Sequence, residues 1–123
     1  MERARVIKEE LFERESRFLA LYIEAENSCL ILLSEKEDKL GTLAIAVPKH
    51  KDTLGPVSSA VILGDRYTVS ARMFAEQVAV KKGKITLVSI YLEKCSELQA
   101  QSFFTRLIEK VTQADTSGEA LKT

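Results

Sequence analysis

Residues 17–33 read RFLALYIEAENSCLILL, and this stretch decides the fold. Its two apolar runs, Phe18 to Ile23 and Cys29 to Leu33, are rich in the aliphatic and aromatic residues that favour strands. The polar residues between the runs, Glu26 to Ser28, are typical of a turn. The stretch therefore predicts a hairpin of two antiparallel strands.

Three later runs have a similar composition and predict further strands. They are Gly41 to Val47, Ser58 to Leu63 and Ile85 to Leu92. Pro48 ends the first of them, because proline has no backbone N–H for a neighbouring strand. Before the hairpin, the apolar residues of Val6 to Phe12 fit a helix as well as an irregular strand, so the pattern alone leaves both open.

Two segments have the three- and four-residue spacing of a helix with one apolar face. In the first segment, this face consists of Ala71, Phe74, Ala75, Val78 and Ala79. Asp65 or Thr68 is expected to cap the start of this helix, and Gly83 to end it. In the second segment, Ser96 and Gln99 predict a capping box. The apolar face that follows consists of Ala100, Phe103, Phe104, Leu107, Ile108 and Val111.

The order of these segments predicts an α+β fold. Short connections between the early strands favour an antiparallel sheet, with the two helices on one of its faces. A chain of 123 residues suits one domain, because two smaller domains would each bury too little surface. We expect this single domain to span residues 1–113. Residues 114–123 have no sustained apolar face and are expected to form a disordered tail.

The predicted strands are apolar on both faces, although helices on one side of a sheet cover only one face. An exposed apolar patch of that size is uncommon on a monomer. We therefore expect two sheets to pack face to face in a dimer. The residues expected at this dimer interface are Leu19, Leu21, Tyr22, Leu32 and Ile45. The alternative is that the first segment or the long loop before Ser58 folds over the second face.

Charge and composition argue against nucleic acid and membranes as partners. Lys plus Arg and Asp plus Glu number 18 each, so no net positive field attracts nucleic acid or an anionic membrane. No signal peptide is readable, and the longest apolar run is too short to cross a bilayer. Cys29 and Cys95 lack the close spacing that would indicate a disulfide framework. We expect a cytoplasmic protein that binds neither nucleic acid nor membrane.

No motif in the sequence indicates catalysis. His50 is the only histidine, so a histidine metal cluster or a His-paired nucleophile has a single candidate. The glycines are spread singly, without the glycine-rich loop that holds phosphates. The carboxylates between Glu9 and Glu15 are interleaved with basic residues, as on a solvated surface. We therefore expect a protein that is not an enzyme, with no catalytic residue, cofactor or metal.

The segment Pro48 to Pro56 is the longest expected connection, and such loops often carry recognition. It contains three neighbouring basic or titratable residues, Lys49, His50 and Lys51. These side chains would suit an acidic rim on a partner. They are the expected partner-binding residues, and the alternative is a solvated loop that makes no contact.

From Leu40 onward the sequence resembles the proteasome-assembly chaperone family, and in particular the third of the eukaryotic members. The resemblance rests on Gly41-Thr42-Leu43, Val61-Ile62-Leu63-Gly64, Phe74-Ala75 and the strand Ile85 to Leu92, in that order. Residues 1–40 match in pattern alone. An archaeal relative, whose partner would be a simpler α-ring, fits the short chain as well.

The resemblance implies a six-stranded antiparallel sheet with two helices on one side, and pairing with a like subunit through the sheets. It also favours a strand over a helix for Val6 to Phe12. Family members have no known catalytic residues, and they hold proteasome α-subunits during assembly of the α-ring. The expected function is therefore that of a homodimeric, non-enzymatic chaperone for proteasome α-subunits. The alternative is a dimeric scaffold or regulatory interaction module with an unrelated protein partner.

Overall fold

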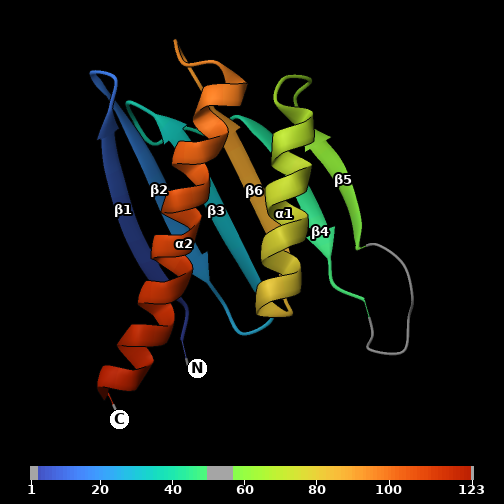
Figure 1. Cartoon of the computed structure of the whole chain (residues 1–123). Helices are drawn as coiled ribbons and strands as arrows, with labels where there is room; N and C mark the ends of the chain where they lie inside the picture. The colour runs from blue at the N-terminus through green and yellow to red at the C-terminus, as the bar shows by residue number, and fades with distance from the viewer. Residues whose placement is uncertain (1–2, 50–56, 123) are drawn as a thin grey trace.

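The structure, a computed structural model, describes residues 3–49 and 57–122, with side chains described as far as Gln113. Six strands form one sheet, and two helices lie side by side on one of its faces (Figure 1). The elements are β1 (Arg5–Glu13), β2 (Ser16–Glu24), β3 (Ser28–Glu35), β4 (Thr42–Val47), β5 (Ser58–Leu63), α1 (Thr68–Lys82), β6 (Ile85–Tyr91) and α2 (Glu97–Lys122). The α+β class is therefore confirmed.

The sheet has the strand order β1-β2-β3-β6-β4-β5. Four of its neighbouring pairs are antiparallel, but β3 and β6 run parallel. The prediction of a purely antiparallel sheet was therefore wrong at the centre. The reason is the crossover through α1, which leads from β5 past β4 to β6. Because β5 and β6 are both antiparallel to β4, they run in the same direction. β3 runs in this direction too, so β6 lies parallel to it.

The N-terminal segment is a strand and not a helix. β1 pairs with β2 along its whole length, from Arg5 opposite Glu24 to Glu13 opposite Ser16. The two strands are joined by Arg14 and Glu15, whose φ angles are 53° and 64°. Two successive residues with positive φ match the tight turn whose twist suits an antiparallel hairpin. The alternation of apolar and charged residues in β1 is thus that of an edge strand.

The predicted apolar faces of both helices are buried against the sheet. Gly83 ends α1 as expected, with φ of 66° and its N–H donated to the carbonyl of Ala79 at 2.8 Å. The expected cap at the start of α1 was wrong, because Tyr67 occupies the N-cap position in the left-handed region and its own side chain makes no capping hydrogen bond. Ser96 caps α2, where its Oγ accepts the N–H of Gln99 at 3.2 Å.

The core lies between the helices and the face of the sheet that they cover. α1 packs on β4, β5 and β6, whereas α2 packs on β1 and β2 (Figure 1). Phe18 of β2 lies beneath α2, with its ring centre 4.8 Å from that of Phe103 and 6.0 Å from that of Phe104. Aromatic contacts of this kind stabilise a core beyond the burial of area alone.

The helix α2 extends past the expected domain boundary at Gln113, to Lys122. The expected disorder of residues 114–123 stays a prediction. The extent of the single domain, residues 1–113, likewise stays a prediction.

Candidate functional site

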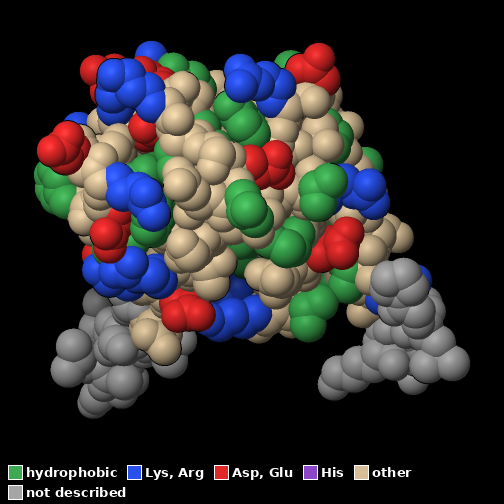
Figure 2. Space-filling model, turned by 45° about the horizontal axis from the view of Figure 1, so that its top comes forward, with side chains coloured by type: hydrophobic (Ala, Val, Ile, Leu, Met, Phe, Trp, Pro, Cys, Tyr) green, Lys and Arg blue, Asp and Glu red, His purple; other side chains and the backbone are tan. Residues whose placement is uncertain are grey.

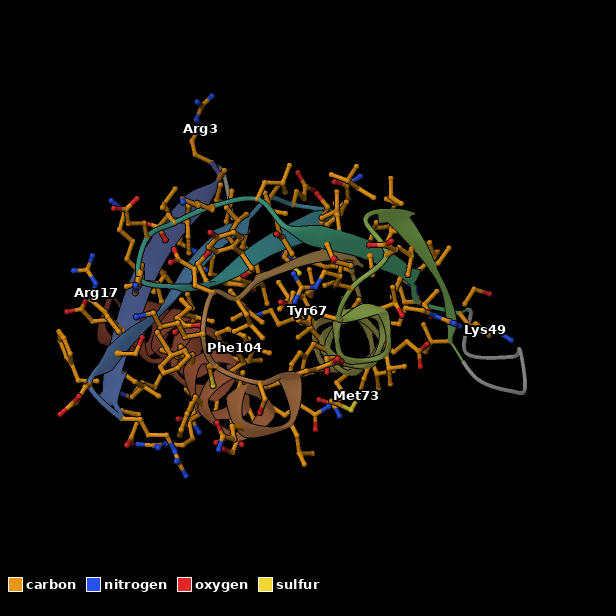
Figure 3. The ribbon with its side chains drawn as sticks, turned by 90° about the horizontal axis from the view of Figure 1, so that it is seen from above. Arg3, Arg17, Lys49, Tyr67, Met73 and Phe104 are labelled. Carbon is orange, nitrogen blue, oxygen red and sulfur yellow. The ribbon has the colours of Figure 1, made fainter. Side chains whose placement is uncertain are left out.

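The sheet has a second face that no helix in the described part of the chain covers, and we call it the open face. Successive residues of a strand point to opposite sides, so each strand contributes every second side chain to it. Its apolar members are Leu19, Leu21 and Ile23 of β2, Leu30 and Leu32 of β3, Ile85 and Leu87 of β6, and Leu43, Ile45 and Val47 of β4. Figure 3 shows this side of the sheet opposite the two helices. The open face is thus apolar across four adjacent strands.

Most of these apolar side chains are partly exposed, because only their neighbours in the same sheet shield them. Exposure is higher at the periphery of this face: Val47, at the end of β4, is 44% exposed, and Val6, on the edge strand β1, is 58% exposed. On the helix side, seen obliquely from the top, the apolar side chains are scattered among charged ones (Figure 2). A continuous apolar area of this kind is typical of a surface that binds another protein.

Charged side chains border the open face along β1. Lys8 and Glu10 of β1 and Arg17 of β2 lie on this border and line a shallow cavity of about 300 Å³. Arg17 forms an ion pair with Glu10, with 3.8 Å between Nη1 and Oε2. Both side chains are well exposed, so this pair contributes little to stability. The apolar surface therefore has a polar rim on one side, as protein interfaces commonly have.

The loop between β3 and β4 covers one end of the open face. Ser34 and Ser89 point to this face yet are fully buried beneath the loop. Ser34 Oγ accepts the N–H of Lys39 at 3.1 Å, and Ser89 Oγ accepts the N–H of Gly41 at 2.8 Å. The alternative of a cover by the first segment is wrong, because that segment is β1 and extends the sheet instead. The other alternative, a cover by the long loop before Ser58, falls largely outside the described residues. The rest of the open face, from Leu19 towards Ile23, lies outside this cover.

Four of the five residues expected at a dimer interface lie on the open face: Leu19, Leu21, Leu32 and Ile45. Tyr22 does not. Its side chain points to the helices and is 0% exposed, and its hydroxyl donates a 2.8 Å hydrogen bond to Oε1 of Glu24. Tyr22 is therefore corrected from an interface residue to a core residue. The period of two within a strand was the signal that separates it from Leu21.

The Glu24 carboxylate is almost completely buried and is held by lysines that sequence reasoning did not link to it. Lys84 Nζ lies 2.5 Å from Oε2, and Lys82 Nζ lies 3.4 Å from Oε1. Lys84 also donates to the carbonyl of Ala25 at 2.9 Å. A buried carboxylate that lost these partners would be strongly destabilising. This cluster fixes the lower end of β2 and thereby the open face.

A second buried carboxylate, Glu35, fixes the opposite end of the sheet. Its Oε1 accepts backbone N–H groups of Glu93, Lys94 and Cys95 at 2.8 to 3.0 Å, and its Oε2 accepts the hydroxyl of Ser16 at 3.0 Å. Burial alone raises the pKa of Glu35, but these hydrogen bonds outweigh burial and hold the pKa below its usual range. Glu35 therefore ties together the start of β2, the end of β3 and the entry to α2.

The two cysteines show no sign of reactive chemistry. Burial raises the pKa of the Cys29 thiol, which lies 3.2 Å from the hydroxyl of Thr86. Burial also raises the pKa of Cys95. A raised pKa disfavours the thiolate, which is the reactive form. Among the described residues, no group of three or more His, Cys, Asp or Glu side chains could hold a metal ion.

Of the expected partner-binding residues, Lys49 is the one that the structure describes. Lys49 follows β4 and is exposed at the end of the sheet (Figure 3). His50 and Lys51 lie outside the described residues, so their role stays a prediction.

In the described part of the chain, no helix has the length and apolar character needed to span a membrane.

No protein-family model matches the sequence, and no curated protein matches it significantly. The fold is similar to a solved structure described as a novel chaperone complex for yeast 20S proteasome assembly. The TM-score is 0.66 at 12% sequence identity, and the match covers 93% of this chain and 96% of that chain. At this identity the likeness shows the fold alone. The resemblance seen in the sequence is thus confirmed for a chaperone-like fold and not for a particular family member.

Proposed function

We propose that this chain is a non-enzymatic chaperone that pairs through the open face with a second copy and assists the assembly of proteasome α-subunits into the α-ring. The observation that carries the proposal is the open face itself, together with the fold that it belongs to. The apolar surface across β2, β3, β6 and β4 needs a cover, and the fold matches a chain from a proteasome-assembly chaperone complex over nearly its full length.

A second copy suits the open face better than an unrelated chain, because one apolar surface with one charged border can meet its own copy about a two-fold axis. Two such sheets packed face to face would form a sandwich with an apolar centre. The charged border of Lys8, Glu10 and Arg17 would then lie at the rim of the interface. The pair would leave the outer helix surfaces and the sheet edges free for a client.

The proposed site of action is the cytoplasm. No catalytic step is proposed, because the described polar clusters, around Glu24 and Glu35, are closed by their own hydrogen bonds and ion pairs. Such clusters stabilise the fold and offer no free acid, base or nucleophile to a substrate.

Sedimentation velocity of the purified chain, alone and with purified proteasome α-subunits, tests the proposal. We expect a dimer alone and a larger complex when α-subunits are added. Native gels should then show faster appearance of the α-ring in the presence of the chain. A dimer that neither binds α-subunits nor speeds ring assembly would favour a scaffold or regulatory module with another partner. A monomer at micromolar concentration would contradict the pairing.

A further inference from the structure

The two edge strands of the sheet differ in a way that bears on recognition. β1, at one edge, carries five charged residues among its nine: Arg5, Lys8, Glu9, Glu10 and Glu13. β5, at the other edge, has the sequence SSAVIL and no charged residue or proline. Charges and prolines are the usual means by which natural sheets prevent a further strand from adding to an edge. β1 is protected in this way, and β5 is not.

In residues 3–49 and 57–122, no strand lies on the outer side of β5. β5 is the last strand of the sheet, and among the described residues it pairs with β4 alone (Figure 1). A register shift opposite Leu43 and Ala44 places a bulge near Ile62, so the regular edge is Ser58 to Val61. The backbone N–H and C=O groups along this edge are the donors and acceptors that an added strand would use.

The side chains beside the edge define the chemistry of such a strand. On the open-face side, Ala60 lies opposite Ile45 of β4, and the large side chain of Ile62 is 55% exposed. On the helix side, the Ser59 hydroxyl donates to Glu76, and Arg72 Nε donates to Ser59 at 3.0 Å. An added strand therefore meets Ser58, Ala60 and Ile62 on the open-face side. On the helix side it meets Ser59 and Val61, with the charged side chains of Glu76 and Arg72 beside Ser59.

We infer that β5 accepts an extended segment of a partner protein, added as a seventh strand, with apolar residues facing the open side and polar residues facing α1. A second copy of β5 is a poorer occupant, because a regular edge of four residues cannot supply the roughly 1,200 Å² that a specific dimer buries. A partner segment gains the backbone hydrogen bonds and the contacts with Ala60 and Ile62 as part of a larger interface. This inference is independent of the proposed chaperone function.

A peptide titration followed by NMR tests the inference on the full chain. The probe is an acetylated and amidated peptide in which Val alternates with Thr, with a Lys at each end for solubility. We expect the backbone amide signals of β5 to shift in a saturable manner and the amides of its outer side to exchange more slowly with solvent. A peptide of the same composition with its Val residues clustered should bind more weakly. The alternating peptide with N-methylated backbone should not bind.

Two variants test whether the peptide binds at the β5 edge or at the β1 edge. Ala60→Lys places a charge beside the β5 edge and should weaken peptide binding by about tenfold or more. Phe12→Lys makes the matched change at the exposed end of β1 and should leave binding unchanged. Equal melting temperatures would show that both variants fold. Shifts confined to β1 or to the open face, no shift at any amide, or equal binding by the two variants would each overturn the inference.

Discussion

The hydroxyl of Ser70, in the first turn of α1, donates a 2.6 Å hydrogen bond to Oε2 of Glu97, the first residue of α2. The same carboxylate oxygen accepts the backbone N–H of Ser70 at 3.3 Å. Gln101, one turn further along α2, donates to the Ser70 hydroxyl at 2.8 Å. The start of α1 thus receives from another helix the acceptor that helices usually obtain from their own N-cap residue.

Glu97→Ala should lower the free energy of unfolding by about 1 to 2 kcal/mol, because the N-terminus of α1 loses a charged acceptor. Glu109→Ala, at an exposed position of the same helix, is the control and should have little effect. Urea denaturation of both variants measures the difference. Equal effects would show that Glu97 acts through α2 alone.

Glu35 should make the protein sensitive to acid. Its folded pKa lies below the ordinary value of 4.5, so the unfolded chain takes up a proton at a higher pH than the folded chain. The stability that Glu35 contributes is therefore complete above about pH 5 and is lost as the pH falls through 4.5 towards the folded pKa. Unfolding free energies measured from pH 7 to pH 3 should show this loss.

Glu35→Gln is the matched variant for the acid effect. It should lower the unfolding free energy at pH 7 by about 2 kcal/mol, because a neutral amide accepts the three N–H groups less strongly. It should also flatten the dependence on pH below 4.5, since no carboxylate is left to titrate at this position. A variant with the same acid sensitivity as the unaltered protein would assign that sensitivity to other groups.

Phe104→Ala and Leu107→Ala should each lower the unfolding free energy by about 2 to 5 kcal/mol, since both side chains are buried beneath α2 and their loss leaves a cavity. Ser96→Ala should cost about 1 kcal/mol through loss of the cap. Thermal and urea denaturation measure the three values. Core changes as mild as the cap change would mean that α2 is not packed as described.

Leu32→Asp should convert the proposed dimer into a folded monomer, because it places a charge in the centre of the open face. Val80→Asp is the control, since Val80 lies on α1 and is already 67% exposed. Sedimentation velocity gives the oligomeric state, and circular dichroism confirms the fold. A dimer in both variants would place the interface elsewhere.

Replacing Lys49, His50 and Lys51 together with Ser should weaken association with proteasome α-subunits and reduce its dependence on salt, because rim charges mainly steer encounter. The melting temperature and the oligomeric state should stay unchanged. Association rates across a salt series measure the effect. Rates with the same salt dependence as in the unaltered protein would exclude this loop from binding.

Much of the secondary structure could be predicted from the sequence, because it depends on local periodicity. The apolar spacing from Ala100 to Val111 predicted the buried face of α2, and Gly83 marked the end of α1. The strand alternation also indicated that Leu21 and Tyr22 point to opposite faces, although not which face the helices cover. Which face the helices bury depends on tertiary packing, and the structure shows that Tyr22 lies on that face and not at the candidate interface.

Features that join distant segments left no local signal. The parallel pairing of β3 with β6 depends on where the α1 crossover returns, which neither strand encodes by itself. The cap of α1 comes from Glu97, 27 residues beyond Ser70, whereas sequence reasoning looked for it at Asp65 or Thr68. The pairing of Lys84 with Glu24 spans 60 residues and is likewise invisible to a short window.

The parallel pairing of β3 with β6 also governs how the chain can fold. It pairs Ser28 with Ile85 and Ser34 with Tyr91, so the two strands meet only when the long intervening segment of chain has been closed into a loop. Closing such a loop is slow compared with forming a hairpin. α2, which covers β1 and β2, follows all six strands in the chain and is synthesised after them. The first three strands must therefore leave the ribosome with both faces bare. We therefore expect a protein that we propose to assist the assembly of other subunits to pass, during its own synthesis, through a stage that is prone to aggregation.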